Sequence, residues 1–172
     1  MNSALTFTGS PYTSFMHETK VTLSNGIELH VEIGGQPEHP AIMLIMGLGA
    51  QLLFWPDFFC KSLIDQGYRV IRFDNRDIGL SSKIRHSGPR LNTFKLMGRF
   101  ALGLENQGAP YNLYDMAEDA ALLIDHLELD NVSVLGASMG GMIAQILAAK
   151  HPQKVSNLGL MFTSNNQPLL PP

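Results

Sequence analysis

Short apolar runs alternate along this chain with segments whose apolar residues recur every three or four positions. The run at 41–46 is apolar throughout, as expected for a central strand of a parallel sheet that is buried on both faces. Further strands are predicted at 68–73, 132–135 and 155–163, and helices at 55–66, 113–129 and 139–150. This order predicts an α/β fold, with flanking helices on a mostly parallel sheet.

An antiparallel hairpin is predicted to form the entry to this sheet. Val21–Leu23 and Ile27–Ile33 flank an Asn-Gly pair, which is the strongest two-residue hairpin signal in the sequence. Residues 1–17 are polar and are expected to be irregular. His30 lies in the second strand and is interpreted as a structural or surface residue.

Two predicted helices each have one apolar face. In 55–66, Pro56 suits the first turn and Gly67 ends the helix. The aromatic and apolar residues that share a face there, and are expected in the core, are Trp55, Phe58, Phe59 and Leu63. In 113–129 the carboxylates opposite the apolar side are interpreted as a solvated face: Asp115, Glu118, Asp119, Asp125 and Glu128.

The stretch 131–151 combines a strand, a tight turn that contains Ser138, and a helix. A serine at the apex of such a turn needs small neighbours, and Gly136 and Gly140 supply that room. The helix dipole and the backbone N–H of Met139 would then face an oxyanion formed beside the serine. The alternatives are a plain glycine-rich turn or a phosphate-binding nest at a helix N-terminus.

Two more loops follow predicted strands. Gly47-Leu48-Gly49 follows the strand at 41–46, and Asp74 and Arg76 begin a D-x-R-x-x-G-x-S block after the strand at 68–73. With the Ser138 turn, these blocks give the chain a pattern that resembles the α/β-hydrolase superfamily, in the branch of small bacterial esterases that includes the aclacinomycin methylesterases. The first loop could also be a glycine-rich β-to-α turn and nothing else.

The resemblance implies roles for these loops. Ser138 would be the nucleophile of a carboxylic-ester hydrolase, and the backbone N–H groups of Leu48 and Met139 would form the oxyanion hole. Met46 stands where the family usually carries a histidine that braces the loop. The residues implied to shape the loops rather than to react are Gly47, Gly49, Asp74, Arg76, Gly136 and Gly140.

The resemblance also concerns length. The family core has eight strands, with a cap usually after the sixth, so residues 1–172 are expected to form one domain that corresponds to the N-terminal portion of that core. The sheet would be truncated after about the sixth strand, without the cap and the C-terminal strands. The tail at 164–172 is interpreted as a linker.

The catalytic acid and base expected after Ser138 do not occur together in this chain. His151 is the only histidine after Ser138, and no Asp or Glu occurs after Ser138. His151 would lie about 20 Å from the serine along a helix, which excludes it as the base. His86, on a loop at the carboxyl edge of the sheet, is the remaining candidate for the base, although the family offers no precedent for a base at that position. The triad is therefore expected to be incomplete, with acid and base beyond residue 172.

Composition narrows the remaining choices. The net charge of -3 and the absence of a basic run argue against a nucleic-acid partner. The single Cys60 is expected to be a buried thiol in a reducing compartment, and no segment predicts a signal peptide or a membrane span, so a cytoplasmic protein is expected. No cofactor or metal site is predicted. A basic amphipathic helix within 82–111 could cover the mouth of the site, pack on the core or touch a membrane surface.

Two functions follow from these observations. The first is a serine esterase acting on a small-molecule ester through Ser138. The second is a catalytically inactive fragment that binds a small ligand or associates with itself. Truncation would expose the strand at 155–163, whose unpaired edge favours a homodimer.

Overall fold

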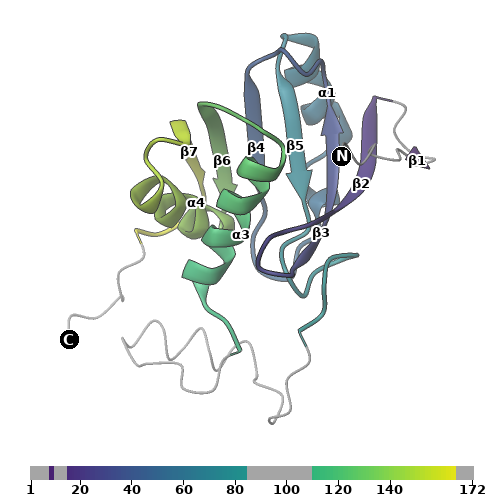
Figure 1. The fold of residues 1–172 in the computed structure, drawn as a ribbon. Helices are drawn as coiled ribbons and strands as arrows, with labels where there is room; N and C mark the ends of the chain where they lie inside the picture. Colours follow the sequence, from purple (N-terminus) through teal and green to yellow (C-terminus); the bar gives the residue numbers. More distant parts are fainter. Residues whose placement is uncertain (1–7, 10–14, 85–109, 166–172) are drawn as a thin grey trace.

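The chain folds into a twisted sheet with helices on both faces (Figure 1). The structure, a computed structural model, describes residues 8–9, 15–84 and 110–165. The strands, in sheet order β1-β2-β3-β5-β4-β6-β7, are β1 (Thr8–Gly9), β2 (Met16–Thr22), β3 (Glu28–Gly34), β5 (Arg69–Phe73), β4 (Ala41–Ile45), β6 (Val132–Ala137) and β7 (Val155–Met161). β5, β4, β6 and β7 are parallel to one another, and β1, β2 and β3 pair antiparallel, which confirms the α/β prediction.

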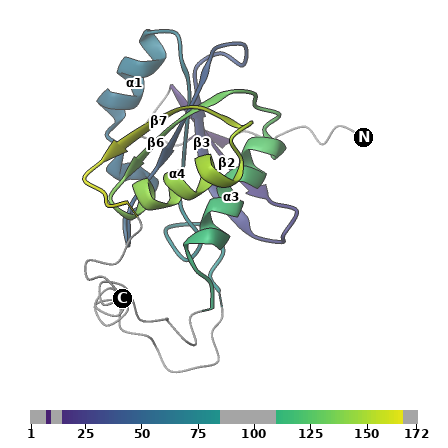
Figure 2. The same ribbon diagram turned by 90° about the vertical axis from the view of Figure 1, so that its left-hand side faces the viewer.

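The described helices lie on opposite faces of this sheet (Figures 1 and 2). The 3-10 turn η1 (Leu52–Phe54) leads into α1 (Asp57–Asp65) on one face, and α3 (Leu113–His126) and α4 (Met139–Lys150) cover the other. α3 begins with a capping box in which the Asn112 side chain accepts from the backbone of Asp115 and the Asp115 carboxylate accepts from the backbone of Asn112. α4 begins directly at the residue after Ser138.

The sheet separates two apolar clusters. The larger lies between the sheet and α3 and α4, and includes Met43, Val134 and Ile143, each at most 1% exposed. The smaller lies under α1 and contains Leu44, Trp55 and Cys60. The alternation of strand side chains explains the division, because neighbouring residues such as Met43 and Leu44 point to opposite faces.

Three sequence-based expectations are wrong in detail. β2 begins at Met16, inside the segment expected to be irregular, because it pairs with β3 along its whole length. Phe58, expected in the core, is 77% exposed on the outer side of α1. Asp119, expected on a solvated face, is only 2% exposed because it is the partner of a buried arginine.

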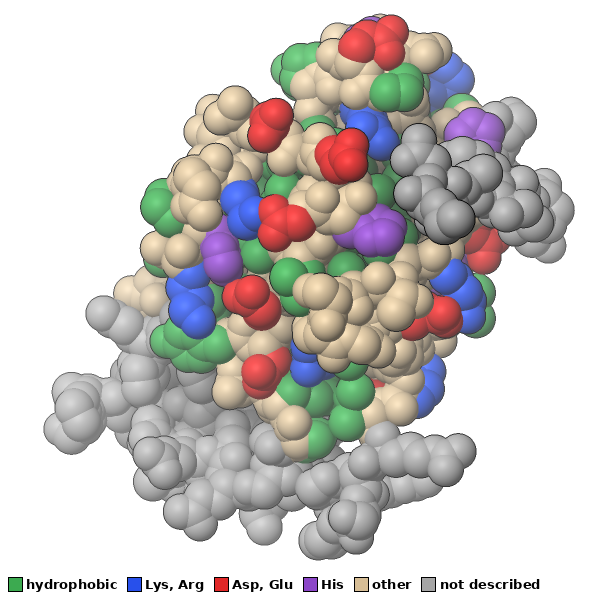
Figure 3. Space-filling model, in the orientation of Figure 1, with side chains coloured by type: hydrophobic (Ala, Val, Ile, Leu, Met, Phe, Trp, Pro, Cys, Tyr) green, Lys and Arg blue, Asp and Glu red, His purple; other side chains and the backbone are tan. Residues whose placement is uncertain are grey.

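The last strand is the edge of the described sheet. β7 pairs with β6 on one side only, and its side chains are intermediate or exposed. Leu158, Leu160 and Met161 are between 38% and 43% exposed, and Phe162 just beyond the strand is 91% exposed. Elsewhere, on the face of the described residues that Figure 3 shows, acidic and basic side chains are interspersed.

Candidate active site

Ser138 lies in a strained turn between β6 and α4. Its φ of 55° and ψ of -125° fall in a region that residues with a side chain rarely adopt. The turn is held at both ends: the Ser138 N–H donates to the Met161 carbonyl at 2.9 Å, and the Ser138 carbonyl accepts from Gly141 at 2.9 Å. The strain is therefore maintained by β7 and by the first turn of α4.

Glycines at two positions are required by close packing around this turn. A Cβ on Gly136 would overlap the backbone of Gly140 and Gly141, and a Cβ on Gly140 would overlap the carbonyl of Ile45 at the end of β4. The small residues two before and two after Ser138 therefore allow β6, α4 and β4 to approach closely, as the spacing predicts.

The loop after β4 lies directly against the serine. A Cβ built on Gly47 would lie 2.9 Å from the Cβ of Ser138 and 3.2 Å from its Oγ. Gly49 has a φ of 72°, which favours glycine, and a Cβ there would meet nothing within 4 Å. The structure thus brings the two predicted glycine loops together at the carboxyl ends of β4 and β6.

Backbone N–H groups are available on both sides of the serine. Met139 is the first residue of α4, so its N–H has no intrahelical acceptor. Neither this N–H nor that of Leu48 has a hydrogen-bond partner among the residues that the structure describes. Leu48 itself is 46% exposed.

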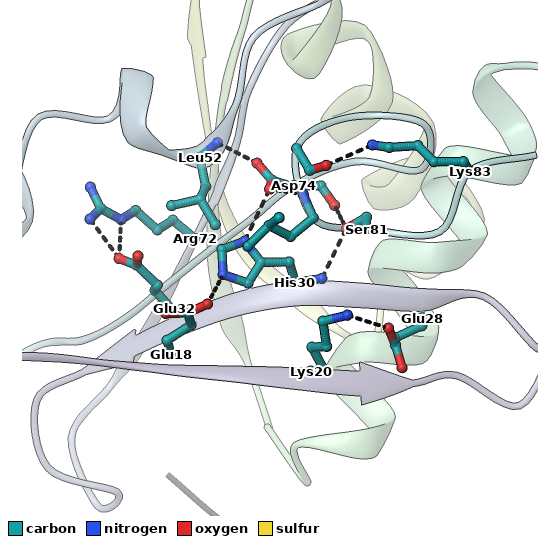
Figure 4. Close-up of polar contacts among 12 residues, drawn as sticks. Glu18, Lys20, Glu28, His30, Glu32, Leu52, Arg72, Asp74, Ser81 and Lys83 are labelled. Carbon is teal, nitrogen blue, oxygen red and sulfur yellow. Dashed lines mark hydrogen bonds and ion pairs between the residues drawn. The ribbon is translucent and has the colours of Figure 1, made fainter. Parts of the chain in front are cut away.

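Asp74, directly after β5, connects the start of η1, the loop after β5 and the strand β3. Its Oδ1 accepts from the Leu52 N–H at 2.8 Å and its Oδ2 from the Leu80 N–H at 3.0 Å. His30 Nδ1 lies 3.0 Å from the same Oδ2 (Figure 4). Burial opposes ionisation of Asp74, but the bonds from His30 and from the two backbone N–H groups outweigh it and hold the pKa of the carboxyl below its usual value.

His30 lies between two carboxylates. Its Nδ1 faces Asp74, and its Nε2 lies 2.8 Å from Oε1 of Glu18 on β2 (Figure 4). Burial lowers the pKa of His30, but the hydrogen bonds and charges of Asp74 and Glu18 prevail, so the pKa is raised above its ordinary value. His30 is 6% exposed, which agrees with a structural role rather than a surface one.

Two buried arginines anchor neighbouring segments. Arg76 donates to both carboxylate oxygens of Asp119 on α3 at 2.6 Å, and Asn25 of the β2–β3 turn donates to the same carboxylate at 2.8 Å. Arg72 on β5 pairs with Glu32 at 2.6 Å and with Asp57 at the start of α1 at 2.8 Å. Asp74 and Arg76 are therefore engaged in contacts that fix the positions of loops and helices.

A cavity of about 460 Å³ lies next to the His30 and Asp74 cluster rather than at Ser138. Its lining combines carboxylates and His30 with apolar side chains, and the residues are Glu18, His30, Glu32, Gln51, Leu52, Leu53, Asp57, Asp74, Gly79 and Leu80. Within the described ranges, no three His, Cys, Asp or Glu side chains are grouped so that they could hold a metal ion.

A family model described as the alpha/beta hydrolase fold matches residues 40–171. The chain belongs to this family. The match includes both glycine loops and the strands that carry them. In the part of the chain that the structure describes, no helix has the length and apolar character needed to cross a membrane.

Individual members of the alpha/beta hydrolase fold family are similar over most of this chain. Rhodomycin D methylesterase DnrP from Streptomyces peucetius is 30% identical over 144 residues, which are 84% of this chain and 42% of that protein. A solved hydrolase from Pseudomonas aeruginosa PA01 has a TM-score of 0.68 and 29% identity, covering 86% of this chain and 46% of that one. The enol-lactonase from Burkholderia xenovorans LB400 has a TM-score of 0.66 and 26% identity, and the match covers 84% of this chain and 46% of that one. The chain thus spans less than half the length of these relatives.

The histidines of this α/β-hydrolase chain do not complete a triad in the described residues. His30 and Asp74 form a His–Asp pair, but β3 is three strands from β6, about 14 Å at the usual strand spacing. His151 follows α4, about 20 Å from Ser138 by helix rise, and its Nε2 pairs with Glu118 at 3.1 Å. His86, and most of the predicted helix in 82–111, lie outside the described residues.

Sequence reasoning missed polar groups that lie around the loop after β4 rather than in it. Asn75, which is 3% exposed, donates its side-chain N–H to the Met46 carbonyl at 2.9 Å. The variable position within D-x-R offered no signal for this bond, since only the sheet order brings β5 next to β4. The Glu18–His30–Asp74 cluster was missed for the same reason.

Proposed function

We propose that this chain carries the nucleophile and the oxyanion hole of a serine hydrolase for small-molecule carboxylic esters, with an incomplete triad. The observation that carries the proposal is the strained Ser138, which has the Gly47 loop against its side chain and the start of α4 directly after it. The names of two relatives, a methylesterase and an enol-lactonase, support an ester or lactone as the substrate class.

The chemistry follows from the positions of these groups. The Ser138 Oγ would form a bond to the acyl carbon while the carbonyl oxygen takes up negative charge. The N–H groups of Leu48 and Met139 would bind that oxyanion, a contribution that typically changes the rate by 10²–10³-fold per donor. The alcohol then leaves and water hydrolyses the acyl-enzyme. A base must accept the serine proton, and the described residues supply none within reach.

An external base tests this proposal in the chain as it exists. A fluorophosphonate phosphonylates Ser138 Oγ: the O–P bond forms, the P–F bond breaks with loss of fluoride, and added imidazole would accept the serine proton in place of a histidine. We expect one adduct by intact-mass measurement, formed at a rate that rises with imidazole concentration. Ser138→Ala should abolish it, whereas Ser133→Ala, on the same strand but outside the turn, should not change it.

Two results would contradict the proposal, one for the role of Ser138 and the other for the incomplete triad. No adduct at any imidazole concentration in the folded chain would exclude Ser138 as a poised nucleophile. Fast labelling without imidazole would show that the chain or a second copy supplies a base, and so would overturn the incomplete triad. His86→Ala would then identify or exclude the remaining candidate.

A second function, a self-associating module without catalysis, is favoured by a separate observation. Among the described strands, β7 is an unpaired edge, and its seven residues include no charged residue and no proline, which are the usual protections of an edge strand. Its exposed Leu158 and Leu160 point to the same side of the sheet. We propose that two copies pair through this edge as a homodimer, whether or not Ser138 reacts.

A further inference from the structure

The segment between β4 and η1 is held at both ends by two consecutive residues that follow β5. At its start the Met46 carbonyl accepts from the Asn75 side chain at 2.9 Å. At its end the Leu52 N–H donates to Asp74 at 2.8 Å. Both holding residues are at most 3% exposed; the bond from Leu52 to Asp74 is buried, and the bond from Asn75 to Met46 is partly buried. The loop that contains Leu48 is therefore oriented by β5 and not by its own sequence alone.

The bond from Asn75 fixes the direction of a peptide plane. In a planar trans peptide the carbonyl and the N–H of the bond point in opposite directions. Because the Met46 carbonyl points to Asn75, the Gly47 N–H points away from it. The Gly47 carbonyl accepts from the Ala50 N–H at 3.3 Å, so the Leu48 N–H in turn points away from Ala50.

Close packing limits the alternatives for this backbone. Gly47 lies against the Cβ and Oγ of Ser138, and the carbonyl group of Met46 lies against Gly140 at the start of α4. A rotation of the Met46–Gly47 peptide would break the bond to Asn75 and change φ of Gly47, on which the orientation of the following Gly47–Leu48 peptide and its Leu48 N–H depends. The side chain of Met46 has no hydrogen-bond donor to hold the loop itself.

We propose that Asn75 is a positioning residue: its side-chain N–H fixes the Met46–Gly47 peptide and thereby aims the Leu48 N–H at the oxyanion position beside Ser138. This inference rests on the proposed function, in which Ser138 is the nucleophile. Asn75 acts only through the loop, so its loss changes the orientation of one donor and leaves the serine in place.

The experiment compares two asparagine side chains that each donate one hydrogen bond to another segment. Asn75→Ala removes a buried donor to Met46, and Asn25→Ala removes the donor to Asp119 of an exposed asparagine in the β2–β3 turn. For Asn75→Ala we expect amide exchange of Ala50, whose N–H is bonded to the Gly47 carbonyl, to accelerate at least tenfold, and imidazole-assisted labelling of Ser138 to slow at least tenfold. For Asn25→Ala we expect both rates to stay within twofold of the wild type.

Asn75→Asp serves as a second variant, because it keeps the size of the side chain and replaces the donor with a charged acceptor, which cannot bond to the Met46 carbonyl. It should reproduce both changes, and circular dichroism should show that it is folded. Unchanged exchange and labelling in Asn75→Ala and Asn75→Asp would overturn the inference, as would equal changes in Asn25→Ala. The exchange rates decide the role of Asn75 even where the wild type is never labelled, a result that would count against the proposed function alone.

Discussion

At the scale of single residues, the two carboxylates beside His30 determine its protonation. Both ring nitrogens lie within 3.0 Å of a carboxylate oxygen, Asp74 on one side and Glu18 on the other. A neutral imidazole has only one N–H, so its other nitrogen would face an acceptor with a lone pair. The geometry therefore requires the doubly protonated form, in agreement with the raised pKa of His30.

This arrangement predicts a dependence of stability on pH. Because the folded-state pKa of His30 is above the ordinary value near 6.5, its contribution is complete below about pH 6.5 and is lost as the pH rises through the folded pKa. We expect His30→Gln to be less stable than the wild type at pH 6 and the difference to shrink toward pH 9. Urea unfolding at intervals across that range measures it, and a difference independent of pH would contradict the assignment.

At the scale of elements, the junction of β4, β6 and α4 depends on Gly140. A methyl group there would overlap the Ile45 carbonyl, which cannot move without displacing the β4 strand and the loop after it. We expect Gly140→Ala to lower the free energy of unfolding by roughly 3 kcal/mol, as overpacking of a rigid site does. Gly67→Ala is the control, because φ is 85° but nothing lies within 4 Å, so only about 1–2 kcal/mol of backbone strain is expected. Thermal or urea unfolding of the two variants compares them, and equal losses would exclude the steric argument.

The contact between α3 and the loop after β5 depends on one buried ion pair. Asp119→Ala would leave Arg76 buried and unpaired, and such a loss typically costs about 3–5 kcal/mol. Glu118→Ala on the same helix removes a half-exposed partner of His151 and should cost less than about 1 kcal/mol. The double variant Arg76→Met with Asp119→Leu should recover much of the loss in urea unfolding. A double variant as unstable as Asp119→Ala would show that the pair itself is required.

The elements were predictable where local chemistry determines them. The Ser138 turn follows from the spacing of Gly136 and Gly140, and the strand at 41–46 from its continuous apolar run. Asp119 was misassigned because helical periodicity places it among exposed carboxylates, and only the loop after β5 supplies its arginine. Phe58 was misassigned because α1 covers only part of the sheet. Contacts between segments distant in sequence, including that of Asn75, depend on strand order and carry no local pattern.

At the scale of the whole molecule, the open edge of the sheet predicts how two copies would meet. Pairing of β7 with β7 of a second copy would be antiparallel about a two-fold axis, which extends the sheet and covers the β7 edge of both copies. Leu158 is the central residue of Val155–Met161, so in a symmetric register it would face its counterpart across the axis. Such a direct cross-strand pair is stabilising when apolar and destabilising when both residues carry the same charge.

A charge at position 158 would oppose the pairing of two copies through β7. We expect the wild type to sediment as a dimer that dissociates on dilution, and Leu158→Glu to sediment as a monomer because two carboxylates would be opposed. Phe58→Glu, which places the same charge on the 77% exposed outer side of α1, should leave the dimer unchanged. A wild type that is monomeric at high protein concentration would exclude the association, and a Leu158→Glu variant that still dimerises would move the interface away from β7. Because the Ser138 N–H is bonded to Met161 at the end of the same strand, dimerisation would also hold one side of the Ser138 turn in place.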